Sequence, residues 1–252
     1  MPNLFRNRKK GIYTFFKGKR LISIIIPVFN EESCIENTLI QLSAIDCPGG
    51  KELIVVDGGS TDNTVFLASK IAKVVLSAKG KAIQLNEGVK NSKGDILFFA
   101  HADMIVPETA LIAICHQIAD GFDGGGFANV FDTYNRKIKL LGTLLNLRFV
   151  RRREQSDRCI FYGDNGIFVT RKVFDELGGF KEIPIMEDYD FSLRMKKKFK
   201  VGQIREPKLV LSARRHIKAG FFKTRLQWIL IKKLYLLGMS PYMLDKWYKD
   251  IR

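Results

Sequence analysis

The sequence predicts an α/β fold of Rossmann-like type, with a mostly parallel central sheet and helices on both faces. Short apolar runs alternate with helical segments through the first half of the chain, which is typical of such sheets. Three apolar runs end directly in acidic residues, at Asp57, at His101–Asp103 and at Glu187–Asp188. Ligand sites of open α/β sheets lie at the carboxyl ends of strands, so the functional site is expected at these three points.

The first half of the chain predicts strands and helices in strict alternation. Pro27 fits the end of the first strand, Pro107 fits the start of a helix, and Ser60, Thr61 or Asp62 is a suitable helix N-cap. The predicted strands are 21–28, 53–56, 74–76 and 95–100, and the predicted helices are 30–43, 60–73, 81–90 and 107–116.

Three successive glycines at 124–126 interrupt this alternation. The strand expected after them therefore has a different connectivity, and the apolar run 183–186 is expected to lead into Glu187 as a strand end. From residue 220 onward the pattern is helical and apolar on most sides. The remaining predicted strands are 127–131 and 167–170, and the remaining predicted helices are 134–150, 172–177 and 191–198.

The positive charge of the chain belongs to its two ends. The 252 residues carry a net charge of +16, made up of +7 in residues 1–20, −4 in 21–188 and +13 in 189–252. This length suffices for one domain with a full core. We therefore expect a basic N-terminal arm (1–20), a globular body (21–217) and basic, apolar C-terminal helices (218–252).

Aromatic residues lie among the positive charges at both ends, which favours an anionic membrane surface as the partner rather than nucleic acid. A solubilising, solvated tail is the alternative. No apolar run approaches the roughly 20 residues that span a bilayer, and no signal-peptide core is found. The four cysteines lack metal-binding spacing and are expected to be reduced thiols. We expect a cytoplasmic protein, peripheral on the inner face of the cell membrane.

Each acidic strand end has a chemical and a structural interpretation. Asp57, followed by Gly58 and Gly59, can accept hydrogen bonds from a base or ribose, or can simply cap a turn. Asp103 is a hard oxygen ligand suited to Mg²⁺ or Mn²⁺, whereas His101 alone is more often structural. Zinc is disfavoured because no further His or Cys stands at a suitable spacing.

The third acidic pair and a lysine-rich loop extend this set. One carboxylate of Glu187–Asp188 can act as a general base toward a hydroxyl, or the pair can cap the following helix. Lys79 and Lys81, with Asn86 nearby, can neutralise a diphosphate, although such loops are commonly only solvated.

Together these motifs resemble the family 2 glycosyltransferases, which have the GT-A fold. Ser23–Glu31 is similar to the first strand and turn of that family, and Val55–Asp62 is similar to the second. His101–Asp103 stands where the Asp-x-Asp motif is expected, Glu187–Asp188 where the catalytic pair is expected, and Gly163–Gly166 resembles the acceptor-side segment. The resemblance covers residues 21–217, and the His-Ala-Asp form resembles a bacterial branch associated with arsenosugar biosynthesis.

The resemblance implies an inverting, metal-dependent transfer of a sugar from a nucleoside diphosphate sugar to a hydroxyl acceptor, which a lipid could carry. It implies Asp188 as the base with Glu187 beside it, and Asp103 as a ligand of Mn²⁺ or Mg²⁺ with His216 as a further ligand. His101 replaces the first Asp of the motif, which usually contacts the ribose. The implied nucleotide-sugar-binding residues are Pro27, Asn30, Glu31, Asp57, Lys79, Lys81, Asn86, His101, Ala102, Asp103 and Asp164.

Two other classes stay open at this point. A nucleotidyltransferase could use a similar sheet and metal ion but would release diphosphate from a triphosphate. A non-catalytic protein that binds anionic lipid or nucleic acid would explain the basic ends, but it gives no role to the three acidic strand ends.

Overall fold

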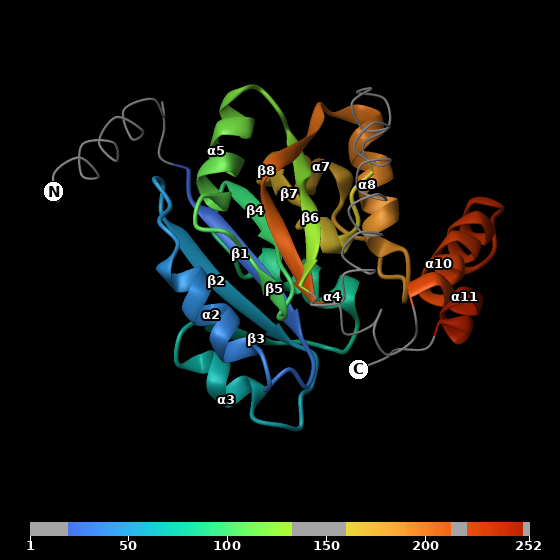
Figure 1. Cartoon of the computed structure of the whole chain (residues 1–252), viewed down its shortest axis with the longest axis horizontal. Helices are drawn as coiled ribbons and strands as arrows, with labels where there is room; N and C mark the ends of the chain where they lie inside the picture. Colours follow the sequence, from blue (N-terminus) through green and yellow to red (C-terminus); the bar gives the residue numbers. More distant parts are fainter. Residues whose placement is uncertain (1–19, 133–159, 213–220, 249–252) are drawn as a thin grey trace, which may run out of the picture.

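The computed structural model describes residues 20–132, 160–212 and 221–248 of the chain (Figure 1). In this part, eight strands form one sheet in the order β3-β2-β1-β4-β7-β6-β8-β5. The strands are β1 (Ile22–Val28), β2 (Lys51–Asp57), β3 (Lys73–Leu76), β4 (Ile96–Phe99), β5 (Met104–Ile105), β6 (Gly124–Asp132), β7 (Phe168–Thr170) and β8 (Val201–Ser212).

The first four strands of this order are parallel, as the alternating sequence pattern predicts. Ile26 of β1 pairs with Val55 of β2, and Ile24 pairs with Phe98 of β4. Both neighbours of β7 run antiparallel to it, while β6 and β8 are parallel to each other. The parallel strands carry nearly continuous apolar sequence because both of their faces are buried.

Helices cover both faces of the sheet and create two apolar cores. The helices α2 (Ile35–Ala44), α3 (Thr64–Ser69) and α5 (Ala110–Ala119) pack with one set of strand side chains, which includes Ile24 and Phe98. The helices α4 (Lys81–Lys90), α7 (Arg171–Leu177) and α8 (Glu187–Lys198) pack with the opposite set, which includes Ile25 and Phe99. The predicted fold class is therefore confirmed.

Several predicted boundaries are wrong. The run 183–186 is not a strand, and Glu187 instead begins α8, so the third acidic site is a helix N-terminus. The second helix ends at Ser69 rather than residue 73, and β6 begins at Gly124 within the glycines expected to interrupt the pattern. The predicted helix 134–150 lies outside the described residues.

Two further helices, α10 (Phe221–Leu236) and α11 (Pro241–Trp247), stand beside the sheet-containing body (Figure 1). Buried Ile231 and Leu244 join them to Ile185, Met186 and Tyr189 at the start of α8. Within the described residues, none of the helices combines the length and the apolar character that crossing a membrane demands. Three cysteines of the described part, Cys34, Cys47 and Cys115, are free thiols.

Candidate active site

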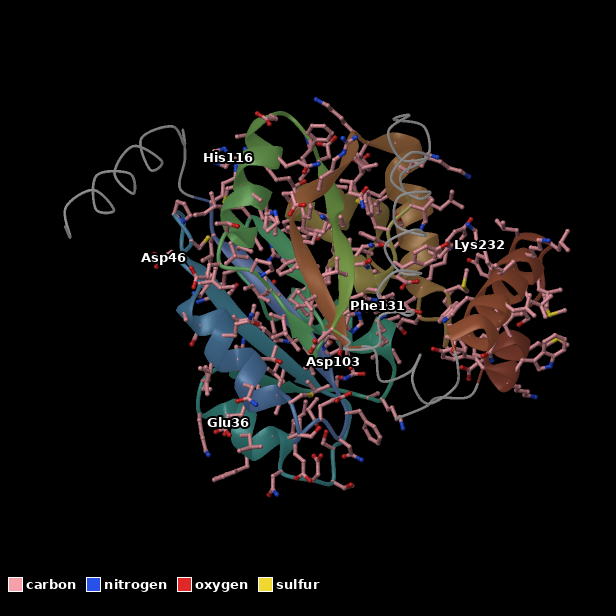
Figure 2. The ribbon with its side chains drawn as sticks, in the orientation of Figure 1. Glu36, Asp46, Asp103, His116, Phe131 and Lys232 are labelled. Carbon is pink, nitrogen blue, oxygen red and sulfur yellow. The ribbon has the colours of Figure 1, made fainter. Side chains whose placement is uncertain are left out.

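The predicted acidic sites converge at one edge of the sheet. Asp103 follows β4 and lies at the lower end of the sheet in Figure 2, which is the edge where the parallel strands end. Glu187 and Asp188 reach this edge from the first turn of α8. That helix begins directly after Met186, whose φ of 70° lies in the left-handed region that non-glycine residues rarely adopt. A residue in this region raises the free energy of the folded backbone, and it persists where the surrounding structure fixes the turn. Such residues are common at functional sites.

A lysine bridges the two catalytic candidates. Lys81 Nζ lies 3.1 Å from Glu187 Oε1 and 3.8 Å from Asp188 Oδ2. The Glu187 side chain is 7% exposed, and the Asp188 side chain is 17% exposed. Two adjacent carboxylates in such surroundings repel each other, and the ammonium group offsets that repulsion.

Gly163 is the point at which three functional groups meet. It begins the short 3₁₀ helix η2 (Gly163–Asn165) and donates its N–H to Asp188 Oδ2 at 2.6 Å. A β-carbon at this position would lie 2.6 Å from Lys81 Nζ, 2.8 Å from His101 Nε2 and 3.3 Å from Asp188 Oδ2. The absence of a side chain therefore allows a lysine, an imidazole and a carboxylate to surround one backbone position.

A small cleft opens at this point. Its walls combine the three polar groups with apolar side chains from β4, α4 and the segment before α8. This combination of an apolar wall and a few convergent polar groups is typical of small-molecule sites. The lining residues are Pro27, Lys81, Leu85, Phe99, Ala100, His101, Gly163, Ile167, Phe180 and Asp188.

The pKa values of the cleft residues reflect burial and the lysine. Burial raises the pKa of Glu187, and the nearby Lys81 opposes this shift only in part. Burial acts to lower the pKa of Lys81, but the carboxylates of Glu187, Asp188 and Asp164 raise it above its ordinary range. Burial, followed by the charge of Lys81, lowers the pKa of His101, so a neutral imidazole is favoured. Perturbed groups that share a cleft mark a functional-site candidate.

Asp57 organises the loop after β2. It is 2% exposed, and its Oδ2 accepts hydrogen bonds from the N–H groups of Gly59 and Ser60 at 2.9 and 3.0 Å. Asn30 and Glu31 join this loop from the end of β1. Asn30 Oδ1 accepts the Thr61 N–H at 2.8 Å, and the Glu31 N–H donates to Thr64 Oγ1 at 2.8 Å. These three predicted ligands therefore shape one loop through contacts within the protein.

Two residues of the lysine-rich segment have contacts that the sequence did not predict. Lys79 Nζ lies 3.6 Å from the centre of the Phe29 ring. Asn86, a predicted nucleotide-sugar ligand, contacts the backbone of Phe180. Its Nδ2 donates to the Phe180 carbonyl at 2.8 Å, and its Oδ1 accepts the Phe180 N–H at 2.9 Å. The amide therefore fixes the cleft wall at Phe180, and each of its ends keeps capacity for one more hydrogen bond.

The other residues predicted to bind the donor or the metal ion differ in how exposed they are. Buried Ala102 accepts a hydrogen bond from Thr38 through its carbonyl, and exposed Asp164 accepts one from Asn129 in the same way at 3.1 Å. Half-buried Asp103 acts electrostatically on His101. His216 lies outside the described residues.

The donor set of the site restricts the kind of metal ion that fits. In the part of the chain that the structure describes, no three His, Cys, Asp or Glu side chains form a metal-binding group. A structural zinc site, which needs four protein ligands, therefore finds no support among these residues. The single carboxylate of Asp103 fits Mg²⁺ or Mn²⁺, because such ions commonly take one or two protein carboxylates and complete their shell with water and substrate phosphate oxygens.

The sequence did not indicate two of these features. Gly163 was identified only within an acceptor-side segment, and its contact with Lys81 joins positions 82 residues apart in the chain. The amide of buried Gln84, which donates to the carbonyls of Val28 and Val56 at 2.8 Å, holds the ends of β1 and β2 beneath the site. In the sequence, Gln84 is distinguished only by its position between Lys81 and Asn86 of the lysine-rich segment.

Comparison with known proteins decides the family. The model of the family "Glycosyl transferase family 2" matches residues 23–178. The chain belongs to this family. The match includes the loop after β2, the lysine segment and the His101–Asp103 motif. Glu187–Asp188 lies beyond its end.

Curated relatives agree with this assignment. The chain is 28% identical to the beta-monoglucosyldiacylglycerol synthase of Synechocystis sp. over 203 residues, which are 74% of this chain and 42% of that protein. It is 25% identical to the probable glycosyltransferase YdaM of Bacillus subtilis over 194 residues, 69% of this chain and 46% of that protein. The chain thus spans less than half the length of these relatives. Neither bears on the arsenosugar branch, which stays a prediction.

Solved structures share the fold. A mannosyltransferase from Pyrobaculum calidifontis, in complex with GDP-Man and Mn²⁺, matches with a TM-score of 0.66 and 19% identity, over 95% of this chain and 74% of that one. Glucosyl-3-phosphoglycerate synthase from Mycobacterium tuberculosis, in complex with Mn²⁺, UDP and glucosyl-3-phosphoglycerate, matches with a TM-score of 0.64 and 18% identity, over 95% and 86%. At these identities the likeness establishes the GT-A-like fold.

Proposed function

We propose that this protein transfers a sugar from a nucleoside diphosphate sugar to an acceptor hydroxyl, with inversion at the anomeric carbon. The observation that carries the proposal is the meeting of Asp188, Lys81 and His101 around Gly163, at the strand ends where such sheets bind ligands. Fold neighbours solved in complex with GDP-Man or UDP support the donor class.

Asp188 is the proposed general base. Its carboxylate takes the proton of the acceptor hydroxyl as that oxygen attacks the anomeric carbon from the face opposite the diphosphate. The new carbon–oxygen bond forms while the bond to the diphosphate breaks, and the diphosphate leaves with the electron pair. The Gly163 N–H, which lies 2.6 Å from Asp188 Oδ2, fixes the orientation of the base. Lys81 positions both carboxylates, because its Nζ lies 3.1 Å from Glu187 Oε1 and 3.8 Å from Asp188 Oδ2.

The donor would lie across the strand ends. The loop that Asp57 organises would hold the nucleoside, since a carboxylate has about four lone-pair sites and two backbone contacts leave capacity for a base or ribose. Pro27 would line this side, and Lys79 would approach the phosphates. Asp103, with His216 as a further candidate ligand, would hold Mg²⁺ or Mn²⁺. A bound divalent cation neutralises charge that develops on the leaving diphosphate.

The relative named for the product beta-monoglucosyldiacylglycerol supports a lipid-linked acceptor at a membrane surface as the specific form of this proposal. The chain would then act as a peripheral protein on the inner face of the cell membrane, with residues 21–217 as the catalytic unit, 1–20 as a basic arm and 218–252 as surface helices.

Donor binding and donor use test the proposal. Calorimetry with UDP and GDP, with and without Mn²⁺, should detect binding that depends on the metal, and Asp103→Ala should abolish this dependence while the fold is kept. Asp175→Ala is the matched control, because Asp175 is an exposed carboxylate on α7 that does not line the cleft. Metal-dependent binding that survives in Asp103→Ala would remove that residue from the role. Turnover of a nucleoside triphosphate with a sugar phosphate would favour nucleotidyl transfer instead.

A further inference from the structure

Exposed apolar side chains are concentrated on the two C-terminal helices. In the described part of the chain, twelve large apolar side chains are exposed, and eight of them lie between residues 226 and 247. Leu226 is 69% exposed and Leu237 is 83% exposed. Isolated exposed apolar residues need no explanation, but a group of this size marks an interaction surface. We refer to helices α10 and α11, residues 221–247, as the C-terminal platform.

Helix α10 is apolar on two opposite sides. Its inner side, at Thr224, Trp228, Ile231 and Tyr235, follows the spacing i, i+4, i+7 and i+11 of one helical face. Thr224 and Ile231 are buried, and the two aromatic residues are half-buried. This side packs against the start of α8 and against α11. It accounts for the docking of the helix onto the body.

Among the described residues, no core cluster includes the apolar side chains on the outer side of α10. Leu226, Leu230, Lys233 and Leu237 follow the same spacing of i, i+4, i+7 and i+11 on the opposite face, and Ile229 lies next to them. The four apolar members are 47–83% exposed. On α11, Tyr242, Met243 and Trp247 are 54–63% exposed, while Leu244 is fully buried between the helices. The platform thus presents an apolar surface on both helices.

We propose that the outer side of the C-terminal platform inserts into the headgroup region of an anionic lipid bilayer. Two features of the platform select lipid over a second copy of the chain. The platform carries Lys223, Arg225, Lys232, Lys233 and Lys246 against the single acid Asp245, a net charge of +4. Two copies brought together through segments of this charge would repel each other, whereas anionic headgroups attract such a segment. Exposed Trp247 and Tyr242 add the amphipathic aromatic rings that favour the membrane interface.

The platform packs against α8, the helix that contains Asp188. Tyr189, which follows Asp188, packs edge-on against Tyr235 of α10 with ring centres 6.0 Å apart, and Lys232 Nζ lies 5.1 Å from the centre of the Tyr189 ring. Asp190 accepts a hydrogen bond from the Tyr235 hydroxyl at 3.4 Å. Bilayer contact therefore places the acceptor side of the cleft near the headgroups. The consequence that the acceptor hydroxyl belongs to a membrane lipid rests on the proposed function, whereas the bilayer contact itself does not.

Tryptophan fluorescence tests the bilayer contact without donor or acceptor. The only two tryptophans of the chain, Trp228 and Trp247, lie on the platform. Vesicles of phosphatidylcholine with phosphatidylglycerol should shift their emission to the blue, and brominated lipid should quench it. Vesicles of phosphatidylcholine alone should bind more weakly, and added salt should weaken the binding to anionic vesicles.

Two triple variants, one on the platform and one elsewhere, show which surface contacts the bilayer. Leu226→Ser/Leu230→Ser/Leu237→Ser should lower vesicle partitioning by about tenfold or more, because three inserting side chains are lost. Phe66→Ser/Leu76→Ser/Ile105→Ser removes three comparably exposed residues elsewhere and should bind as the unmodified protein does. Circular dichroism and thermal midpoints confirm that both variants fold.

Three outcomes would overturn the inference. The first is equal partitioning of the two triple variants. The second is vesicle binding without quenching of tryptophan, which would assign the contact to another part of the chain. The third is a lipid-free dimer, detected by light scattering, that only the platform variant dissociates, because the outer side would then be a protein interface. Each outcome leaves the donor-binding result unaffected, so failure of this inference and failure of the proposed function are distinguishable.

Discussion

Glu187 and Asp188 are neighbours in the chain, yet their side chains have different partners. Glu187 is 5% exposed and paired with Lys81, whereas Asp188 lines the cleft and accepts the Gly163 N–H. This asymmetry supports a division of roles in which Asp188 meets the acceptor and Glu187 supports it. General-base function requires that the carboxylate reach the reacting proton, and it is Asp188 that lines the cleft.

Glu187→Gln should show a pH-dependent effect on the free energy of unfolding. The pKa of Glu187 is raised in the folded state because of burial. Its stabilising contribution is therefore fully present below its unfolded pKa and is lost as the pH rises through the folded pKa. Relative to the unmodified protein, Glu187→Gln should be more stable at neutral pH than at acidic pH. Urea unfolding at several pH values measures this. A constant difference, or one of opposite slope, would contradict the assigned environment.

Gly163→Ala should impair the site far more than the fold. The new methyl group would lie within 3 Å of Lys81 Nζ and His101 Nε2, both of which would have to move. We expect turnover to fall by about 10²-fold, as for other displacements of about 1 Å near the chemistry. The thermal midpoint should change little, because the displaced atoms are the ends of side chains that border a cleft. Gly178→Ala is the control for backbone strain alone: Gly178 has open space around it but a φ of 71°, so this variant should lose some stability and keep normal turnover. Normal turnover in Gly163→Ala would contradict the convergence of Lys81, His101 and Asp188 at Gly163.

The residue types of the site were predictable from sequence, but their partners were not. Asp57, His101–Asp103 and Glu187–Asp188 were identified because each follows an apolar run or stands in a family motif. Lys81 was expected to neutralise a diphosphate, and its ion pairs with Glu187 and Asp188 depend on packing between α4 and α8. The contact of the Asn86 amide with the Phe180 backbone likewise depends on packing that the sequence does not reveal.

At the scale of elements, the packing of α10 against the start of α8 connects the platform to the site. Ile231 is 1% exposed and packs with Ile185 and Met186, which immediately precede Glu187 and Asp188. Ile231→Ala should destabilise this contact by about 2–5 kcal/mol, the usual range for a buried Ile-to-Ala change. Hydrogen exchange should show lost protection in α10 and α11, with the strands of the sheet unaffected.

Ile229→Ala on the same helix is the matched control for that experiment. Ile229 is 47% exposed and lies on the outer side, so its truncation should leave hydrogen exchange unchanged. Equal effects of the two variants would mean that the two sides of α10 are equivalent and that the inner side does not dock the helix.

Elements with strong periodicity were predicted well, and the others were not. The helix Lys81–Lys90 was predicted with its observed boundaries, because Ala82, Leu85 and Val89 mark one apolar face. Strand β8 was missed because Pro207 and several charged residues interrupt its pattern, and it pairs with the distant strands β6 and β5. The run 183–186 has the apolar sequence of a strand but forms none, because a short apolar segment does not reveal by itself whether it pairs with another strand.

In the molecule as a whole, positive charge and exposed apolar side chains are found together in the C-terminal helices. The body between the two basic ends carries the acidic residues of the site, and the described C-terminal helices combine positive charge with exposed apolar side chains. The mostly parallel sheet follows from the alternation of strands and helices in the first half. The antiparallel pairing of β7 with β4 and with β6 could not be predicted from the sequence, because these strands are separated by long segments of the chain.

Turnover of Asp188→Asn, measured together with its donor affinity, shows whether Asp188 is the base of an inverting transfer. Asparagine keeps the shape of the side chain but cannot accept the proton, so kcat should fall by about 10²–10⁴-fold while donor affinity stays nearly unchanged. NMR of the product should show an inverted anomeric centre. An Asp188→Asn variant that turns over at the normal rate, or a product with retained configuration, would contradict the account.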